Sequence, residues 1–531
     1  MRKINRRAVG AALVAAISVA ASPTIGAPPA VQGPESVEAW YQQGQKFIRQ
    51  SERLSQERSK HHGRARNVIL FVGDGMGIST ITAARILEGQ LNGQPGEENR
   101  LSFEDFPDVA LSKTYSWDQQ TPDSAPTMTA MITGYKAREG MLSVDHLTAR
   151  GECDAAVVAR HALPTLLEQA AAAGKSTGVV STARLTHATP AATYAHTPVR
   201  DWESDADLNQ FFASQVASCR ASGVPLVKDI ARQLIEVSPA VKASLKVAMG
   251  GGRSNFLPKT MTDPEYAKSG RRSDGRDLTA EWVSSRGPRA RYVWDKAGFA
   301  AADPATTDYL LGLFENSHMQ YEADRARDGS GEPSLTEMTE KAIRMLDKNR
   351  RGYFLHVEGG RIDHAHHAGN ARRALLDTIE MARAVRKAYE MTDRRDTLII
   401  VTADHSHTFT IAGYPHRGND ILGLVSPVPG NDGDAVSHDK AADGLPYTTL
   451  AYQNGPGAPG GSAAALGRSV DLSSVDTGAL DFLQQAAVPL SAETHAGEDV
   501  AIYATGPKSA LVHGSMEQNW IYHVMKAAFG F

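Results

Sequence analysis

Short apolar runs recur along the chain and alternate with longer stretches of helical spacing. The clearest runs cover residues 67–72, 177–180, 245–248, 353–357, 397–401 and 500–503. Residues 163–173 and 371–389 repeat apolar positions at intervals of three and four, which predicts helices. Strands alternating with helices are typical of βαβ units, so we predict an α/β fold with a central, mostly parallel sheet flanked by helices.

The pattern divides the chain into one large domain with additions. A helical pattern at 36–58 predicts an N-terminal arm, and the alternation of the core begins near residue 66. Between 413 and 492 the alternation fades while Gly and Pro become frequent. We therefore predict a core at 66–412, an inserted loop-rich subdomain at 413–492 and a C-terminal end of the core at 493–531.

The first 27 residues have the pattern of an export signal. Four basic residues precede an apolar stretch that ends in small residues. The stretch is too short for a convincing membrane span, although an uncleaved anchor stays open. The adjacent Arg6 and Arg7 permit twin-arginine export as well as the general route. We expect an exported protein, periplasmic or secreted.

Composition narrows the class further. The 531 residues are 41% hydrophobic and 22% charged, as in an ordinary large globular protein. The formal net charge of −4 gives no basic surface, so no nucleic-acid partner is expected. Cys153 and Cys219 are the two cysteines, and an even pair in an exported protein usually forms a disulfide. Two separate buried thiols are the alternative.

Polar residues collect where the predicted strands stop. Asp74 follows the first run, Glu358 the fourth, and Asp404 with His405 the fifth. Open α/β sheets bind ligands beyond the carboxyl ends of their strands, so these side chains form one candidate site. Taken alone, Asp74 between two glycines could equally cap a turn.

Two histidine-containing motifs and a later histidine suit a divalent metal. Carboxylates and imidazoles at such spacings build hydrolytic sites with open coordination. A solvated histidine run, or a histidine that only orients a ligand, remains open for individual members. The residues concerned are Asp363, His364, His367, His405, His407 and His495.

Ser124 stands before a predicted helix. On its own, a serine at this position is typical of a helix cap. Beside a metal, its hydroxyl could ionise and attack phosphorus while backbone N–H groups donate to the anionic oxygens. The guanidinium of Arg200 could bind two oxygens of a phosphate, or it could be a solvated charge. His187 and Thr189, taken separately, could be ordinary polar residues.

Together these motifs resemble the alkaline phosphatase family from about residue 67 to 524. The motifs stand in the family's order: Gly-Asp74-Gly-Met-Gly, Asp123-Ser124-Ala, His187-Ala-Thr189, Glu358-Gly-Gly-Arg-Ile-Asp363-His364, Asp404-His405-Ser-His407 and Glu493-Thr-His495-Ala-Gly-Glu-Asp. His187 and His364 are closer to the animal type. Pro126 departs from the small residue that is commoner there, and we assign no residues to the calcium site of animal members.

The resemblance implies a set of roles. A first zinc would be held by Asp363, His367 and His495, and a second by Asp74, Asp404 and His405. Magnesium would be held by Asp74, Thr189 and Glu358. Ser124 would be the nucleophile and Arg200 would bind the phosphoryl oxygens. Residues acting just outside the direct ligands would be His187, His364 and His407.

The implied activity is hydrolysis of phosphate monoesters to an alcohol and inorganic phosphate through a covalent phosphoserine. The family also implies a homodimer, with the N-terminal arm reaching the partner, and a disulfide near Cys153 and Cys219. Two other classes stay open: a relative acting on diesters, sulfate esters or nucleotide pyrophosphates, and a non-enzymatic zinc- or phosphate-binding protein. Arg200 and the complete third-metal set argue against the former, and Ser124 argues against the latter.

Overall fold

The computed structural model describes residues 63–428, 437–458 and 470–531. The predicted export signal at 1–27 and the predicted arm at 36–58 lie outside these residues. Among the helices of the described ranges, none combines the length and the apolar character that crossing a bilayer requires.

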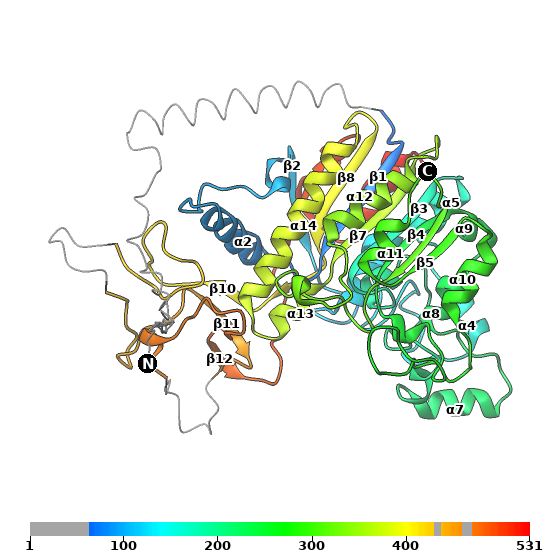
Figure 1. The fold of residues 1–531 in the computed structure, drawn as a ribbon, viewed down its shortest axis with the longest axis horizontal. Coiled ribbons are helices and arrows are strands. Elements are labelled where there is room, and N and C mark those ends of the chain that lie inside the picture. Colours follow the sequence, from blue (N-terminus) through cyan, green and yellow to red (C-terminus); the bar gives the residue numbers. More distant parts are fainter. Residues whose placement is uncertain (1–62, 429–436, 459–469) are drawn as a thin grey trace, which may run out of the picture.

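A ten-stranded sheet runs through the centre of the protein (Figure 1). Its strands, in order across the sheet, are β15 (Gly514–Glu517), β2 (Asp108–Lys113), β14 (Val500–Thr505), β8 (Thr397–Ala403), β1 (Asn67–Gly73), β7 (Tyr353–Gly359), β3 (Ser176–Arg184), β4 (Leu245–Gly251), β6 (Tyr309–Leu313) and β5 (Ala290–Val293). Only β14 runs antiparallel to its neighbours in this sheet. The predicted mostly parallel sheet is confirmed, and all six predicted runs are strands in it.

Helices cover both faces of this sheet. In β1 the side chains of Ile69 and Phe71 pack into one apolar core, and those of Leu70 and Val72 into the other. Burial on both faces explains why the central strands read as continuous apolar runs. The first layer contains α2 (Ile78–Leu91), α11 (Lys296–Ala301), α12 (Leu335–Leu346) and α14 (Ala371–Met391). The second contains α3 (Ser124–Thr133), α5 (Leu166–Ala172), α8 (Ile230–Ile235), α9 (Pro239–Ser244), α10 (Leu278–Arg286) and α15 (Trp520–Phe529).

Local signals set the helix boundaries. The predicted helix at 371–389 is α14, which begins after Asn370, whose side chain accepts a hydrogen bond from the N–H of Arg373. The helix predicted at 163–173 is the shorter α5, because Thr165 and Glu168 form a capping box that starts it at Leu166. At α3 the cap position belongs to Asp123, so Ser124 is the first helical residue and not the cap itself.

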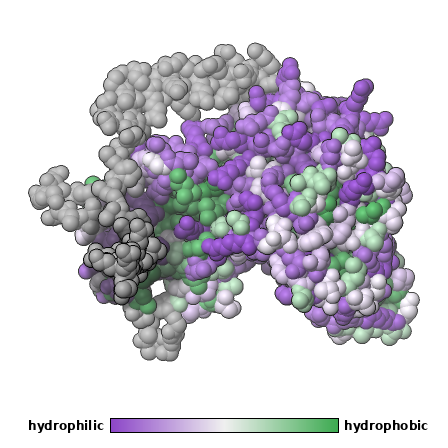
Figure 2. Space-filling view, in the orientation of Figure 1, coloured by the Kyte–Doolittle hydropathy of each residue, from purple (hydrophilic) through white to green (hydrophobic). Residues whose placement is uncertain are grey.

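Two small sheets lie beside the large one. β10 (Phe409–Ile411), β11 (Leu450–Gly455) and β12 (Ala486–Pro489) form the first, which we call the small sheet. β9 (Ser406–His407) pairs with β13 (His495–Ala496) to form the second. Because β10 precedes residue 413, the small sheet takes one strand from the predicted core. Hydrophobic surface gathers in the hollow between α2 and the small sheet (Figure 2).

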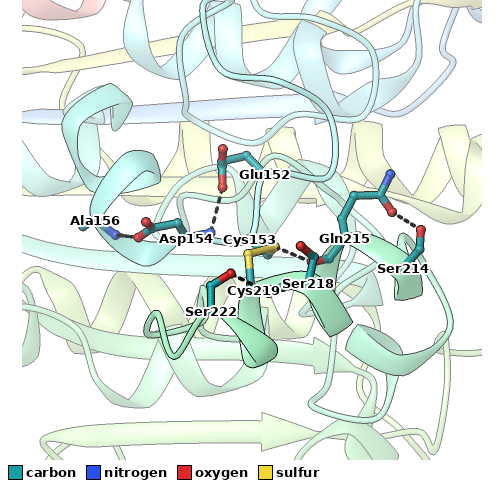
Figure 3. Close-up of a disulfide and its surroundings, with 9 residues drawn as sticks. All are labelled: Glu152, Cys153, Asp154, Ala156, Ser214, Gln215, Ser218, Cys219 and Ser222. Atoms are coloured by element: carbon teal, nitrogen blue, oxygen red, sulfur yellow. Dashed lines mark hydrogen bonds between the residues drawn. A yellow bond between two sulfur atoms is a disulfide. The ribbon is translucent and has the colours of Figure 1, made fainter.

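A disulfide joins Cys153 and Cys219, whose Cα atoms are 6.3 Å apart (Figure 3). It ties α7 (Ala213–Ala221) to the chain just before α4 (Ala155–His161). Cys153 packs in a separate buried cluster that includes Trp202 and Val216. The predicted disulfide is present, and the alternative of two separate thiols is wrong.

Candidate active site

Three neighbouring parallel strands bring the site's carboxylates to one edge of the sheet. Asp74 follows β1, Asp404 follows β8, and Glu358 is the penultimate residue of β7. Gly73 pairs with Ala403 on one side and with Gly359 on the other, so the three acids stand at nearly the same level. The prediction that these strand ends meet is confirmed.

Gly75 allows the chain to turn sharply beyond β1. It has a φ of +67°, and a Cβ there would lie 2.3 Å from Nε2 of His407. Its N–H donates to Oδ1 of Asp404 at 2.9 Å. A side chain at position 75 would therefore be strained and would displace His407.

Ser124 lies at the start of α3, buried and close to two of these residues. Its Oγ is 3.3 Å from Oδ1 of Asp74 and 3.2 Å from Nε2 of His405. Pro126 stands third in α3, within the first turn, where the backbone N–H has no partner in the helix. The departure at Pro126 is therefore compatible with the helix, although one N–H that could face an anion is lost.

Asp363, His367, His407 and His495 form what we call the histidine-rich group. Asp363 and His367 come from α13 (Arg361–His367), and the other two from β9 and β13. The Nε2 atoms of His407, His367 and His495 lie 2.8, 3.3 and 3.3 Å from Oδ1 of Asp363. Three segments of the chain thus direct their nitrogens at one carboxylate oxygen.

The outer nitrogens of these imidazoles are all held. Nδ1 of His367 donates to the carbonyl oxygen of Glu493, and Nδ1 of His495 to that of Pro122. Nδ1 of His407 donates to the carboxylate of Glu493. This arrangement leaves each Nε2 on the inside, which is how metal-binding histidines are usually oriented.

Charge is balanced within the histidine-rich group. Burial alone would raise the pKa of Asp363, but the imidazoles of His367, His407 and His495 outweigh it and hold that pKa well below its usual range. Burial likewise opposes the charged form of His407, yet its bonds to Asp363 and Glu493 raise its pKa to about 10. Each partner favours the ionised form of the other.

Asp74, His187, Glu358, Asp404 and His405 form what we call the carboxylate-rich group. Thr189, at the start of the short α6 (Ala188–Ala191), places its hydroxyl 3.4 Å from Oδ2 of Asp74. Burial and the nearby Asp363 raise the pKa of Asp74 to about 7, and burial with Asp74 does the same for Asp404. The pKa of Glu358 is raised well above its usual value by burial and by Asp74.

This carboxylate-rich group fits divalent cations. Oδ2 of Asp404 and Oε1 of Glu358 are buried without a hydrogen-bond partner among the described residues. Buried carboxylates that face one another need a countercharge, and carboxylate, hydroxyl and imidazole donors are those of Zn²⁺ and Mg²⁺ sites. The predicted ligands are thus brought together in two sets, which adjoin where the rings of His405 and His495 stack with their centroids 3.5 Å apart.

Arg200 contacts the carboxylate-rich group through His187. Nη2 of Arg200 donates to Nε2 of His187 at 2.9 Å, and Nη1 donates to Oδ2 of Asp123 at 3.2 Å. His364 lies further out: its ring centroid is 5.4 Å from that of His187 and 4.0 Å from that of His318. His318 was not predicted, because a single histidine in a loop after β6 carries no pattern.

The structure also brings together residues to which the sequence analysis assigned no role. Glu493 contacts two members of the histidine-rich group, as described above. Beyond the end of β6, Glu265, Glu315 and Asp328 place carboxylate oxygens within 4.8 Å of one another. Burial and Glu265 raise the pKa of Asp328 to about 7. These three acids come from separate loops, so no spacing along the chain could have revealed them.

The site has a hydroxyl at the start of a helix, beside clustered metal donors at the carboxyl edge of a mostly parallel sheet. This arrangement is typical of metal-dependent α/β hydrolases. Within that class the chain belongs to the alkaline phosphatase family, whose family model matches residues 65–531. It is accordingly a phosphoric monoester hydrolase that depends on divalent metals.

Individual relatives agree with this assignment. The tissue-nonspecific alkaline phosphatase of Mus musculus is 46% identical over 495 residues, which are 92% of this chain and 88% of the mouse protein. An alkaline phosphatase of Gadus morhua is 46% identical over 471 residues, covering 88% of this chain and 92% of that one. The crystal structure of the Thermus thermophilus alkaline phosphatase shares the fold, with a TM-score of 0.59, 23% identity and coverage of 88% and 92%.

Proposed function

We propose that this phosphatase works through a covalent phosphoserine at Ser124, with two zinc ions and one magnesium ion. Asp363, His367 and His495 would hold the first zinc. Asp74, Asp404 and His405 would hold the second, and magnesium would be held by Asp74, Thr189 and Glu358. The position of Ser124 Oγ, 3.3 Å from Asp74 and 3.2 Å from His405, is the observation that carries the proposal.

The protein's own groups account for binding and attack. Arg200, held by Asp123, is available to bind two phosphoryl oxygens. Oγ of Ser124 forms the bond to phosphorus while the bond to the departing alcohol breaks, and water then breaks the serine–phosphorus bond. Bound cations would neutralise phosphoryl charge and favour the ionised forms of the attacking and leaving oxygens.

Residues around these ligands would orient them. His407 donates to Asp363, His187 contacts Arg200, and His364 packs beside His187. The monoesterase assignment, rather than diester or sulfate ester hydrolysis, is favoured by Arg200 and by the oxygen donors of the third metal set. A non-enzymatic binding protein would have no use for Ser124.

We further propose that the protein is exported and homodimeric. The disulfide between Cys153 and Cys219 is typical of an oxidising compartment, in agreement with the signal pattern at 1–27. Residues 413–492 are proposed as an insertion in a core spanning 66–412 and 493–531. Gel filtration with light scattering would test the dimer, and N-terminal sequencing of the protein recovered from the periplasm or medium would test the cleaved signal.

Trapping the phosphoenzyme tests the mechanism. The wild type, mixed with excess p-nitrophenyl phosphate and quenched in acid, should carry one phosphate on the peptide that contains Ser124. Ser124→Ala should bind metals, carry no phosphate and lose turnover by at least about 10³-fold. Ser515→Ala, at an exposed serine of β15, is the matched control. Normal turnover by Ser124→Ala, or faster hydrolysis of the bis ester, would overturn the proposal.

A further inference from the structure

Glu493 contacts two imidazoles of the histidine-rich group at once. Its carboxylate Oε2 accepts a hydrogen bond from Nδ1 of His407 at 2.5 Å. Its carbonyl oxygen accepts one from Nδ1 of His367, also at 2.5 Å. Of the histidine-rich group's three imidazoles, only that of His495 is held elsewhere, by Pro122.

The contact between residue 493 and α13 is reciprocal. The N–H of Glu493 donates to the carbonyl oxygen of His367 at 2.9 Å, and its own carbonyl accepts from the His367 ring. Two bonds between the same two residues fix both the distance and the rotation of the His367 ring. Their separation of 126 positions in sequence makes this a tertiary contact.

Glu493 is itself held rigidly. It is buried, with 1% of its surface exposed, and its Oε1 accepts from both the N–H and the hydroxyl of Thr408 at 2.7 Å. Thus every acceptor position of this side chain is directed at β9 or the residue just after it. A carboxylate is the side chain that can accept three such bonds without donating any.

The end of β11 in the small sheet supports the same segment. Asn454 and Thr494 exchange two hydrogen bonds, of 2.9 and 3.0 Å. A Cβ at Gly455 would approach the Cβ of Glu493 to 3.1 Å, so the strand end packs directly on residue 493. The small sheet therefore fixes the backbone from which Glu493 reaches the two imidazoles.

The consequence lies in which ring nitrogens face inward. A proton held on Nδ1 leaves Nε2 free to act as a ligand, and it also prevents the ring from turning over. In the case of His407, Nε2 lies 2.8 Å from Oδ1 of Asp363, so Glu493 also restrains Asp363 through that ring. One residue thereby orients most of the histidine-rich group.

We propose that Glu493 is a positioning residue that sets the zinc affinity of the histidine-rich group. The inference rests on the proposed function only in taking zinc as the ion of that group. Glu493 touches neither substrate nor the reacting atoms; it acts by holding His367 and His407. Removing its carboxylate should weaken one metal site and leave the two sets built on Asp74 unchanged.

The test measures metal release. Glu493→Gln keeps the size of the side chain but must turn an N–H toward either Thr408 or His407. With zinc and magnesium bound, this variant should release one zinc equivalent to a chromogenic chelator roughly 10–100-fold faster than the wild type, a typical effect for the partner of a metal-binding histidine. The second zinc and the magnesium should leave at the wild-type rates. Glu498→Gln, on the same segment but bonded to Ser406, is the matched control.

The outcomes separate clearly. A folded Glu493→Gln variant that releases all its metals at the wild-type rate overturns the proposal, as does equal acceleration of every metal, which would mean a general loosening of the fold. Should Glu493→Gln not fold, Asn454→Ala weakens the same support at the surface and should accelerate the same zinc equivalent about threefold; no acceleration would again overturn it. Phosphoenzyme formation is measured separately, so failure of the Ser124 mechanism and failure of this proposal give different results.

Discussion

The two halves of the site neutralise their charge in opposite ways. In the histidine-rich group, Asp363 faces three imidazoles, and its pKa is lowered while that of His407 is raised to about 10. In the carboxylate-rich group, acids face acids, and burial raises the pKa of Asp74 and Asp404 to about 7. The first group is close to neutral by itself, whereas the second needs an added cation to hold its carboxylates ionised.

The two groups also differ in what supports them. The carboxylate-rich group stands on the ends of β1, β7 and β8, which are buried in the middle of the large sheet. The histidine-rich group is assembled from α13, β9 and β13, with Glu493 and the small sheet behind it. Under the proposed assignment the histidine-rich group holds one zinc, whereas the carboxylate-rich group holds the second zinc and also the magnesium, for which oxygen donors are suited.

The largest effect is expected at the centre of the histidine-rich group. Asp363→Asn removes the charge on which three Nε2 atoms converge. With p-nitrophenyl phosphate, kcat/KM should fall by about 10³-fold or more, since a metal supplies several kcal/mol of transition-state stabilisation. Elemental analysis should find one zinc fewer per chain. A variant within tenfold of the wild type would remove Asp363 from the ligand set.

A smaller loss of activity is expected in the carboxylate-rich group. Glu358→Gln takes one oxygen ligand from the proposed magnesium site but leaves Ser124, Arg200 and both proposed zinc sets intact. We expect kcat/KM to fall by about 100-fold and to recover in part when magnesium is raised. Retention of both zinc equivalents is the control. Loss of zinc together with magnesium would show that the two groups are not separable.

The sequence predicted the carboxylate-rich half better than the other, for a physical reason. Asp74, Glu358 and Asp404 each follow an apolar run that is buried on both faces. The run that predicts each strand therefore also predicts where the acidic side chain after it lies. The hydrogen bonds of Glu493 could not be predicted from the sequence, because its partners His367 and His407 are 126 and 86 residues away.

The weaker strand signals explain what was missed in the fold. β2 alternates buried and exposed side chains, and β5 has only four residues, so neither gives a continuous apolar run. Ser124 was placed before its helix because a serine there resembles a cap, whereas Asp123 takes the extended backbone of the cap position. The family motifs, rather than local patterns, supplied the complete set of candidate ligands.

In the metal-free protein, neutralising one carboxylate should change the free energy of unfolding with opposite signs in the two groups. Because burial and Asp74 raise the pKa of Glu358, the folded chain keeps a proton that the unfolded chain releases above about pH 4.5. Stability is therefore lost as pH rises, and Glu358→Gln should stabilise the chelated protein by about 2 kcal/mol at pH 7.5. Asp363→Asn should destabilise it by about 3 kcal/mol, because the charged His407 loses a buried partner. Urea unfolding of both variants in excess chelator measures this, and shifts of the same sign would contradict the contrast.

The smallest effect concerns an imidazole that has no carboxylate partner. His356 in β7 is fully buried, and among the described residues neither of its ring nitrogens has a hydrogen-bond partner. Burial lowers its pKa to about 3. Below pH 6.5 the imidazole binds a proton in the unfolded chain but stays neutral in the folded chain. The contribution of His356 to stability is therefore fully present above pH 6.5 and is lost as pH falls toward 3. His356→Phe removes this dependence, and relative to its own effect at pH 8 it should stabilise the protein by about 1.4 kcal/mol at pH 5.5. Urea unfolding at the two pH values measures the difference. An equal effect at both would mean that His356 is charged or paired in the folded protein, as His407 is, and that burial alone does not decide the state of an imidazole here.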